Sequence, residues 1–232
     1  MQEAALSKTL PAHLRRRAAL AAWTKAVLLD GAANANAVAP ALAELMPALK
    51  PLLGEYAAAQ TAPQRKSIAI YLILRYPVTR PYVDAGAGRE TPDTDIDSYR
   101  DNWWCGTNLS YEATQEAAYA VENGETPKAR PAPPALAFLT AAQKTAAQSE
   151  NARLQSYGTA PNFLCQQTIA WAARSPQDPR VPEALHLAVK ATRYACTDKE
   201  TGKNSKAAYD LLKKNYPKSE WAQKTKYWYN GN

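Results

Sequence analysis

Prolines at the boundaries of apolar, helix-periodic segments constrain the fold of this chain more than any other feature. The 232 residues include 17 prolines but only 9 glycines. Proline cannot extend the helix before it but is tolerated in the first turn of the next, so most of these prolines mark helix ends or starts. Alanine is abundant, whereas the β-branched residues Val and Ile are sparse, which favours helices over strands. The sequence therefore predicts an all-α fold.

Apolar residues recur at helical spacing in most of the chain. The predicted helices span residues 11–29, 37–59, 63–76, 110–123, 134–157, 161–174, 179–194, 205–215 and 219–228. Three prolines kink or split the second of these helices, and the third is apolar nearly all round, which is typical of a central, buried helix. Residues 77–108 break the pattern and are expected to form one long irregular loop. The remaining helices are joined closely enough to predict hairpins stacked as an α-solenoid-like array.

A proline-rich stretch between Gly124 and Pro134 is the best candidate for a domain boundary. It predicts an N-terminal helical region, residues 1–130, which carries the long loop. The C-terminal region, residues 131–232, would then consist of helical hairpins.

The same junction joins predicted helices twice in the C-terminal region. Ser175-Pro176-Gln177-Asp178 and Tyr216-Pro217-Lys218-Ser219 lie 41 residues apart, and Tyr76-Pro77-Val78-Thr79 repeats the pattern in the first half. Proline ends the preceding helix, and Asp178 or Ser219 offers a side-chain oxygen to the free N–H groups of the next one. The junction is therefore a helix stop followed by a helix start.

The residues around the last junction, Tyr216-Pro217-Lys218-Ser219-Glu220-Trp221-Ala222, form a Tyr-Pro-x-Ser-x-x-Ala motif. This motif resembles tetratricopeptide-type helical repeats of bacterial cell-envelope proteins, and the resemblance covers about residues 160–230. It implies a stack of helical hairpins with a concave face for a peptide or protein partner. It implies no catalytic residue.

The net charge of +7 is unevenly distributed. Residues 186–232 hold ten Lys and Arg against four acids, whereas residues 84–101 hold six acids against two Arg. A basic end of this kind suits nucleic acid, anionic lipid or an acidic protein surface, but a lysine-rich helix often has only a solvated face. A nucleic-acid partner is therefore not expected.

The three cysteines lack the spacing of a zinc site. Cys165 lies inside a predicted helix and is expected to be a small buried residue. Cys105 and Cys196 lie at or near loops and could form a disulfide, which would indicate an oxidising compartment such as the periplasm. Three free thiols are the alternative.

The clearest candidate for a ligand-binding cluster is in the long loop, where Tyr99, Arg100, Trp103 and Trp104 combine aromatic rings with a charge. The alternative is that these rings anchor the loop to the helical body. The preceding acids, residues 93–97, begin like a calcium loop but lack its turn glycine and its final Glu, so no metal site is predicted. No cofactor motif is present.

No constellation of residues typical of catalysis emerges from the sequence. The two histidines, His13 and His186, lie far apart, and neither has a nucleophile at a characteristic spacing. Glu183, near a predicted helix start, is explained by capping and the helix dipole. We therefore expect the chain not to be an enzyme by itself.

The sequence thus predicts a non-catalytic protein-binding or peptide-binding scaffold, part of a larger bacterial envelope protein or assembly. Its location would be the periplasm or cell envelope if a precursor carries a signal, and otherwise the cytoplasm. Two alternatives are a domain of an enzyme acting on cell-wall glycan and a basic nucleic-acid-binding helical protein. No apolar run is long enough to predict a transmembrane segment, and no feature indicates an oligomeric state.

Overall fold

The structure is a computed structural model that describes residues 2–79, 119–126, 140–193 and 197–230. These residues form helices and turns with no strand among them, so the all-α prediction is confirmed. The helices are α1 (Gln2–Leu6), α2 (Ala12–Leu28), α3 (Ala32–Leu45), α4 (Lys50–Ala58), α5 (Ala62–Arg75), α7 (Ala141–Ser156), α8 (Ala160–Arg174), α9 (Val181–Ala191), α10 (Thr201–Asn215) and α11 (Glu220–Lys224). Two 3-10 turns, η1 (Pro47–Leu49) and η2 (Pro77–Thr79), follow α3 and α5.

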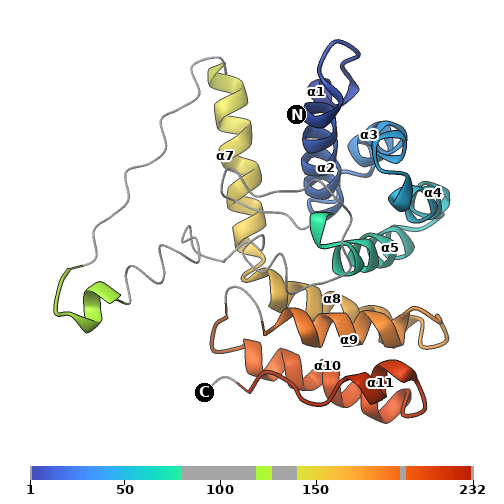
Figure 1. Ribbon diagram of the computed structural model, residues 1–232, viewed down its shortest axis with the longest axis vertical. Helices are drawn as coiled ribbons and strands as arrows, with labels where there is room; N and C mark the ends of the chain where they lie inside the picture. The colour runs from blue at the N-terminus through green and yellow to red at the C-terminus, as the bar shows by residue number, and fades with distance from the viewer. Residues whose placement is uncertain (1, 80–118, 127–139, 194–196, 231–232) are drawn as a thin grey trace.

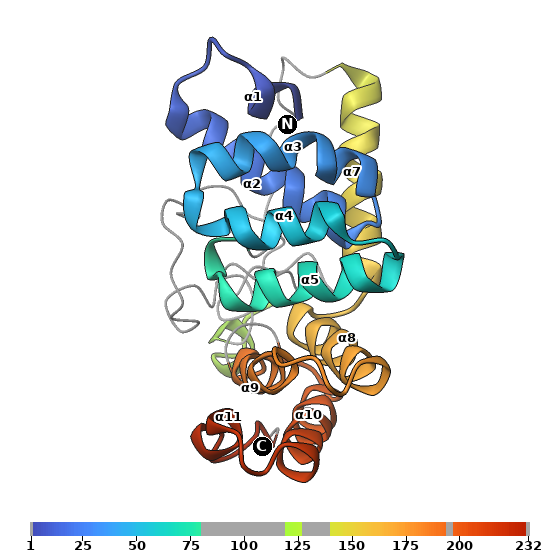
Figure 2. The ribbon, with the colours of Figure 1, turned by 90° about the vertical axis from the view of Figure 1, so that its right-hand side faces the viewer.

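The helices succeed one another along the long axis of the molecule, with α1–α5 towards one end and α8–α11 at the other (Figure 1). Helix α7 runs along this axis instead, beside α2, whereas α3, α4 and α5 lie across it (Figure 2). Helix α5 contacts both α8 and α9 and so joins the two groups. Buried apolar side chains from α1 to α11 form one continuous core.

The prediction that the third helix is central and buried agrees with the structure. Every residue of α5 from Ser67 to Leu74 is buried. The helix begins with a capping box, in which the Thr61 hydroxyl accepts from the Gln64 backbone N–H and the Gln64 side chain accepts from the Thr61 N–H. Its start is thus set locally, while its burial follows from an apolar surface on all sides.

The segment predicted as one kinked or split helix is split. Helix α3 begins at Ala32, five residues earlier than expected, and continues through Pro40 to Leu45. The turn η1 and helix α4 come next, with Pro51 in the first turn of α4 where its missing N–H costs nothing.

A residue followed by proline ends a helix in the same way at four places. Each such residue donates its N–H to the carbonyl four residues earlier and accepts from the N–H three residues later. The residues are Met46, Tyr76, Ser175 and Tyr216. Their φ angles lie between −118° and −139° and their ψ angles between 45° and 92°, outside the helical region that a following proline disfavours. The sequence predicted three of these junctions, and the structure adds the one at Met46.

The two predicted caps after the C-terminal junctions differ. The Ser219 hydroxyl accepts from the Ala222 N–H and caps α11 as expected. No side chain caps α9, because the helix begins only after Arg180, so the prediction for Asp178 holds in part. The Asp178 carboxylate accepts the backbone N–H of Arg180 at 3.0 Å and also binds its guanidinium. One backbone hydrogen bond and an ion pair thus take the place of the cap.

The last predicted helix, residues 219–228, is shorter than expected. Helix α11 ends at Lys224, and residues 225–230 are not helical. The Thr225 hydroxyl donates to the Trp221 carbonyl and lies 2.7 Å from the ring nitrogen Nδ1 of His186. These contacts hold Thr225 in place as the helix ends, and Trp228 beyond it packs on Tyr209 of α10.

Several predictions concern residues outside the described ranges. These are the long loop beyond η2, most of the helix at 110–123, and the domain boundary near residue 130. Residues 119–122 of that helix are helical, and α7 begins at Ala141 within the helix predicted for 134–157. Among the described residues, no helix combines the length and apolar character needed to cross a membrane.

Candidate functional site

The ligand-binding cluster predicted from the sequence, Tyr99, Arg100, Trp103 and Trp104, lies outside the described residues, as do both members of the predicted Cys105–Cys196 disulfide. Cys165 is described and is buried, as expected. Its thiol donates to the Ala188 carbonyl at 3.4 Å, and burial raises its pKa to about 12, so it is an inert packing residue.

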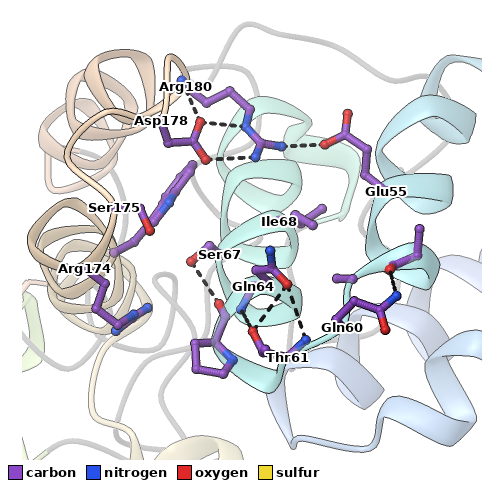
Figure 3. A pocket seen from close by; sticks show the side chains of 14 residues that line it. Glu55, Gln60, Thr61, Gln64, Ser67, Ile68, Arg174, Ser175, Asp178 and Arg180 are labelled. Atoms are coloured by element: carbon purple, nitrogen blue, oxygen red, sulfur yellow. Dashed lines mark hydrogen bonds and ion pairs between the residues drawn. The ribbon is translucent and has the colours of Figure 1, made fainter.

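A groove of about 600 Å³ lies where the α4–α5 loop meets the turn between α8 and α9 (Figure 3). One wall comes from residues 55–68, which include the end of α4, the loop and the start of α5. The other comes from residues 171–180, at the end of α8 and in the following turn. Two parts of the chain that are remote in sequence therefore build the groove together.

Arg180 ties the two walls together (Figure 3). Its Nε and Nη2 donate to the two oxygens of Asp178 at 3.0 and 2.9 Å, and its Nη1 donates to Glu55 across the groove at 2.6 Å. The guanidinium also lies over the rings of Tyr71 and Trp171, at 5.9 and 5.8 Å from their centroids. This arrangement uses the planar, multidentate character of arginine in full.

The electrostatic consequence is a stable ion pair. Burial by itself raises the pKa of Asp178, but hydrogen bonds and positive charge from Arg180 outweigh burial and lower that pKa. The pKa of Arg180 is raised, chiefly by its hydrogen bond to Asp178. Both groups therefore remain charged at neutral pH, and each is the ion-pair and hydrogen-bond partner of the other.

A second polar contact joins α9 to α5. Glu183, in the first turn of α9, accepts hydrogen bonds from the Tyr71 hydroxyl at 2.6 Å and from Arg75 Nη1 at 2.5 Å. The Tyr71 ring packs edge-on against Trp171, and burial and the Glu183 carboxylate raise the pKa of the Tyr71 hydroxyl. The position of Glu183 at a helix start therefore explains only part of its role, because it also binds α9 to α5.

The groove keeps polar groups that a ligand could use. Arg174 is exposed at the end of α8 and extends towards the α5 wall (Figure 3), and it makes no ion pair within the part of the chain that the structure describes. The carbonyl oxygen of the Gln64 side chain is used by the cap on Thr61, which leaves its NH₂ group for other partners. Ile68 adds an apolar surface. The lining thus offers hydrogen-bond donors, one cation and apolar contact.

Neither histidine belongs to this groove. His186 packs against Trp221, with ring centroids 5.2 Å apart, and burial, aided by nearby Lys and Arg, lowers its pKa to about 4. His13 is exposed near the start of α2. Among the described residues, no group of three or more His, Cys, Asp or Glu side chains could hold a metal ion.

Local sequence patterns do not identify the groove. Arg180 and Glu55 are 125 positions apart, and no short motif connects them. The one available signal is the proline junction of Ser175 to Asp178, which proves to form part of one wall. By itself, the pattern of that junction indicates only a break between helices.

No known protein family, curated protein or solved structure matches the chain. The tetratricopeptide-type resemblance accordingly stays a prediction. The fold and the groove define an all-α protein with an open, mixed polar and apolar site between two helical groups.

Proposed function

We propose that the chain is a non-catalytic scaffold that holds an extended segment of a protein partner in the groove between α5 and α8. The observation that carries this proposal is a groove lined from two remote segments, with Arg180 fixing its walls and Arg174 exposed at its edge. Its volume of about 600 Å³ is large enough for several side chains of a ligand. A fixed shape with accessible polar groups favours binding without prior rearrangement.

The chemistry of the lining favours a peptide with an acidic residue. The Gln64 amide and the Ser175 hydroxyl can pair with backbone groups, while the exposed Ala58 and Pro63 can contact apolar side chains. The exposed guanidinium of Arg174 can form a charge-assisted, bidentate pair with a carboxylate. We therefore expect an Asp, a Glu or a C-terminal carboxylate at this end of the groove.

The same lining argues against the glycan-cleaving alternative. That mechanism needs two carboxyl groups, one of which has a raised pKa so that it can act as the acid. Glu55 and Asp178 are the carboxylates of the groove, and both are bound to Arg180. The lowered pKa of Asp178 is opposite to what an acid catalyst requires. These contacts support binding over catalysis.

The cellular location of the scaffold and of its partner is proposed from the sequence alone. The Tyr216-Pro217-Lys218-Ser219 junction resembles repeats of bacterial envelope proteins, so we place the scaffold and its partner in the cell envelope. This part of the proposal is independent of the groove.

A random peptide library displayed on phage and selected on the folded chain tests the proposed function. Enriched peptides would be synthesised and their affinities measured by fluorescence polarisation. We expect acidic peptides whose affinity falls about tenfold or more in Arg174→Glu, because a charge-assisted hydrogen bond contributes about 1.5–3 kcal/mol. Lys203→Glu, the same charge change on an exposed α10 residue at the far end of the C-terminal hairpins, is the control. Equal losses in both variants, or no enrichment, would contradict the proposal.

A further inference from the structure

The chain after α11 lies in an extended conformation against α9 and α10. Residues 225–230 form neither helix nor turn, and they return beside α10 to the C-terminus (Figure 1). We call this stretch the tail segment. Its contacts involve its backbone as well as its side chains.

Two side chains hold the backbone of the tail segment. The hydroxyl of Ser205, a fully buried residue on α10, accepts a hydrogen bond from the Tyr229 N–H at 3.0 Å. The guanidinium of Arg193, just after α9, donates to the Tyr227 carbonyl. The Thr192 hydroxyl lies 2.8 Å from the Ser205 hydroxyl oxygen and fixes its orientation. One donor and one acceptor thus recognise an extended main chain, whatever its side chains.

Gly202 lets the tail segment approach α10 closely. A Cβ atom built at this position would lie 3.2 Å from the carbonyl oxygen and 3.3 Å from the carbonyl carbon of Asn230. These distances are shorter than ordinary van der Waals contact, so a side chain here would push the segment away. A glycine where another backbone passes is a common feature of sites that bind a main chain.

Successive side chains of the tail segment make separate contacts, with α10 and with Arg193 after α9. Trp228 packs on Tyr209 of α10, with centroids 5.0 Å apart, and the ammonium of Lys206 lies 5.3 Å from its ring centroid. Tyr227 remains 59% exposed, and Arg193 lies 3.8 Å from its ring centroid. Separate contacts for successive side chains, together with backbone hydrogen bonds, are how proteins recognise extended peptides.

We propose that the surface formed by α9 and α10 is a second peptide-binding groove, which takes an extended partner segment with an aromatic side chain at the Trp228 position. The chain's own tail segment occupies this groove and competes with that partner. A segment tethered by a few residues has an effective concentration in the millimolar range, so the intact chain binds the partner weakly until the tail is displaced. This inference does not rest on the groove between α5 and α8.

The probe for this site is a fluorescent peptide with the sequence of residues 224–230, Lys-Thr-Lys-Tyr-Trp-Tyr-Asn. Its affinity is measured by fluorescence polarisation for the full chain and for the full-length variant Trp228→Ala, in which the tail loses its largest contact. We expect the variant to bind the peptide at least about tenfold more tightly than the unaltered chain. A scrambled peptide should bind neither protein.

A second variant shows where the peptide binds. Adding Gly202→Val to Trp228→Ala places a side chain in the path of the peptide backbone and should remove the gain in affinity. The proposal is overturned if a folded Trp228→Ala variant binds no more tightly than the unaltered chain, or if Gly202→Val has no effect. It is also overturned if Trp228→Ala loses its helical circular dichroism signal, since the tail segment would then be part of the core.

Discussion

Helices α5 and α7 begin in the same way but have opposite surroundings. Both open with a Thr-x-x-Gln capping box, formed by Thr61 and Gln64 in α5 and by Thr140 and Gln143 in α7. In α5, eight consecutive residues are buried, whereas in α7 the buried residue is Leu154. A capping box therefore determines where a helix begins but not where the helix lies in the fold.

The difference comes from the residues after the cap. The second half of α5 is apolar at nearly every position, so it can be covered on all sides by α2, α4, α8 and α9. Helix α7 has Gln, Lys, Ser, Glu and Asn distributed around it, and it contacts the body through a few polar side chains and Leu154. We therefore expect substitutions in α5 to affect the whole molecule and those in α7 to act locally.

The largest effect should come from Leu72→Ala in α5. Leu72 is fully buried, and truncation of such a leucine costs about 2–5 kcal/mol through lost burial and the cavity left behind. Chemical denaturation followed by circular dichroism measures this loss. Ser149→Ala, at an exposed position of α7, should change stability by less than about 0.5 kcal/mol. Similar losses in the two variants would invalidate the contrast between the helices.

The next effect should come from Glu183→Ala, which removes the polar contact between α9 and α5. The Tyr71 hydroxyl and Arg75 would lose their shared acceptor in a partly buried setting, at a cost of about 1–3 kcal/mol. Chemical denaturation measures this loss, and Glu183→Gln, which keeps an acceptor for Tyr71, should lose less. A loss in Glu183→Gln as large as in Glu183→Ala would show that the charge, rather than the hydrogen bond to Tyr71, holds α9 to α5.

The elements that the sequence predicted well are those with local signals at both ends. The predicted bounds of α5 agree with the structure to within one residue at each end, because Thr61 caps the helix and Pro77 stops it. The junctions at Ser175 and Tyr216 are predictable for the same reason. A proline and a capping side chain act within one turn of helix, so the local sequence contains the whole signal.

The features that the sequence did not reveal depend on partners remote in the chain. Trp221, Thr225 and Trp228 keep helical spacing, but Trp228 packs on Tyr209 of α10, and the helix ends before it. The groove at Arg180 depends on Glu55, which no local pattern indicates. Tertiary contacts of this kind override local periodicity.

The two histidines extend the comparison to pH. Burial lowers the pKa of His186 to about 4, whereas His13 is exposed. His186 therefore binds a proton more tightly in the unfolded chain than in the folded one. The free energy of unfolding is unaffected by the protonation of this residue above about pH 6.5, and it falls as the pH decreases from there towards 4. Allowing for the partial exposure of the ring, we expect a loss of about 1–2 kcal/mol. The measurement is the difference between the urea midpoints at pH 7.5 and pH 4.5. This difference should be smaller in His186→Gln than in the unaltered chain, and it should be unchanged in His13→Gln.

Removal of the two equivalent caps tests the comparison most directly. Loss of an N-cap hydroxyl costs about 1 kcal/mol. In Thr61→Ala we expect this loss in global stability, because α5 does not unfold separately from the core. In Thr140→Ala the global stability should change little, and hydrogen exchange of the Gln143 and Lys144 amides should accelerate instead. Equal global losses would mean that α7 is as tightly coupled to the core as α5.

The smallest effect should come from Arg153→Ala, on the side of α7 that meets α2. Arg153 Nη2 donates to the Leu29 carbonyl at 3.1 Å, but the side chain is exposed, so water can replace it as the donor. We expect a change of at most about 0.5 kcal/mol in chemical denaturation, while hydrogen exchange along α7 becomes faster. A decrease of more than about 1.5 kcal/mol in the free energy of unfolding would show that Arg153, like Glu183, joins separate helices of the fold. The difference between α5 and α7 would then lie in the kind of contact, polar for α7 and apolar for α5, rather than in its strength.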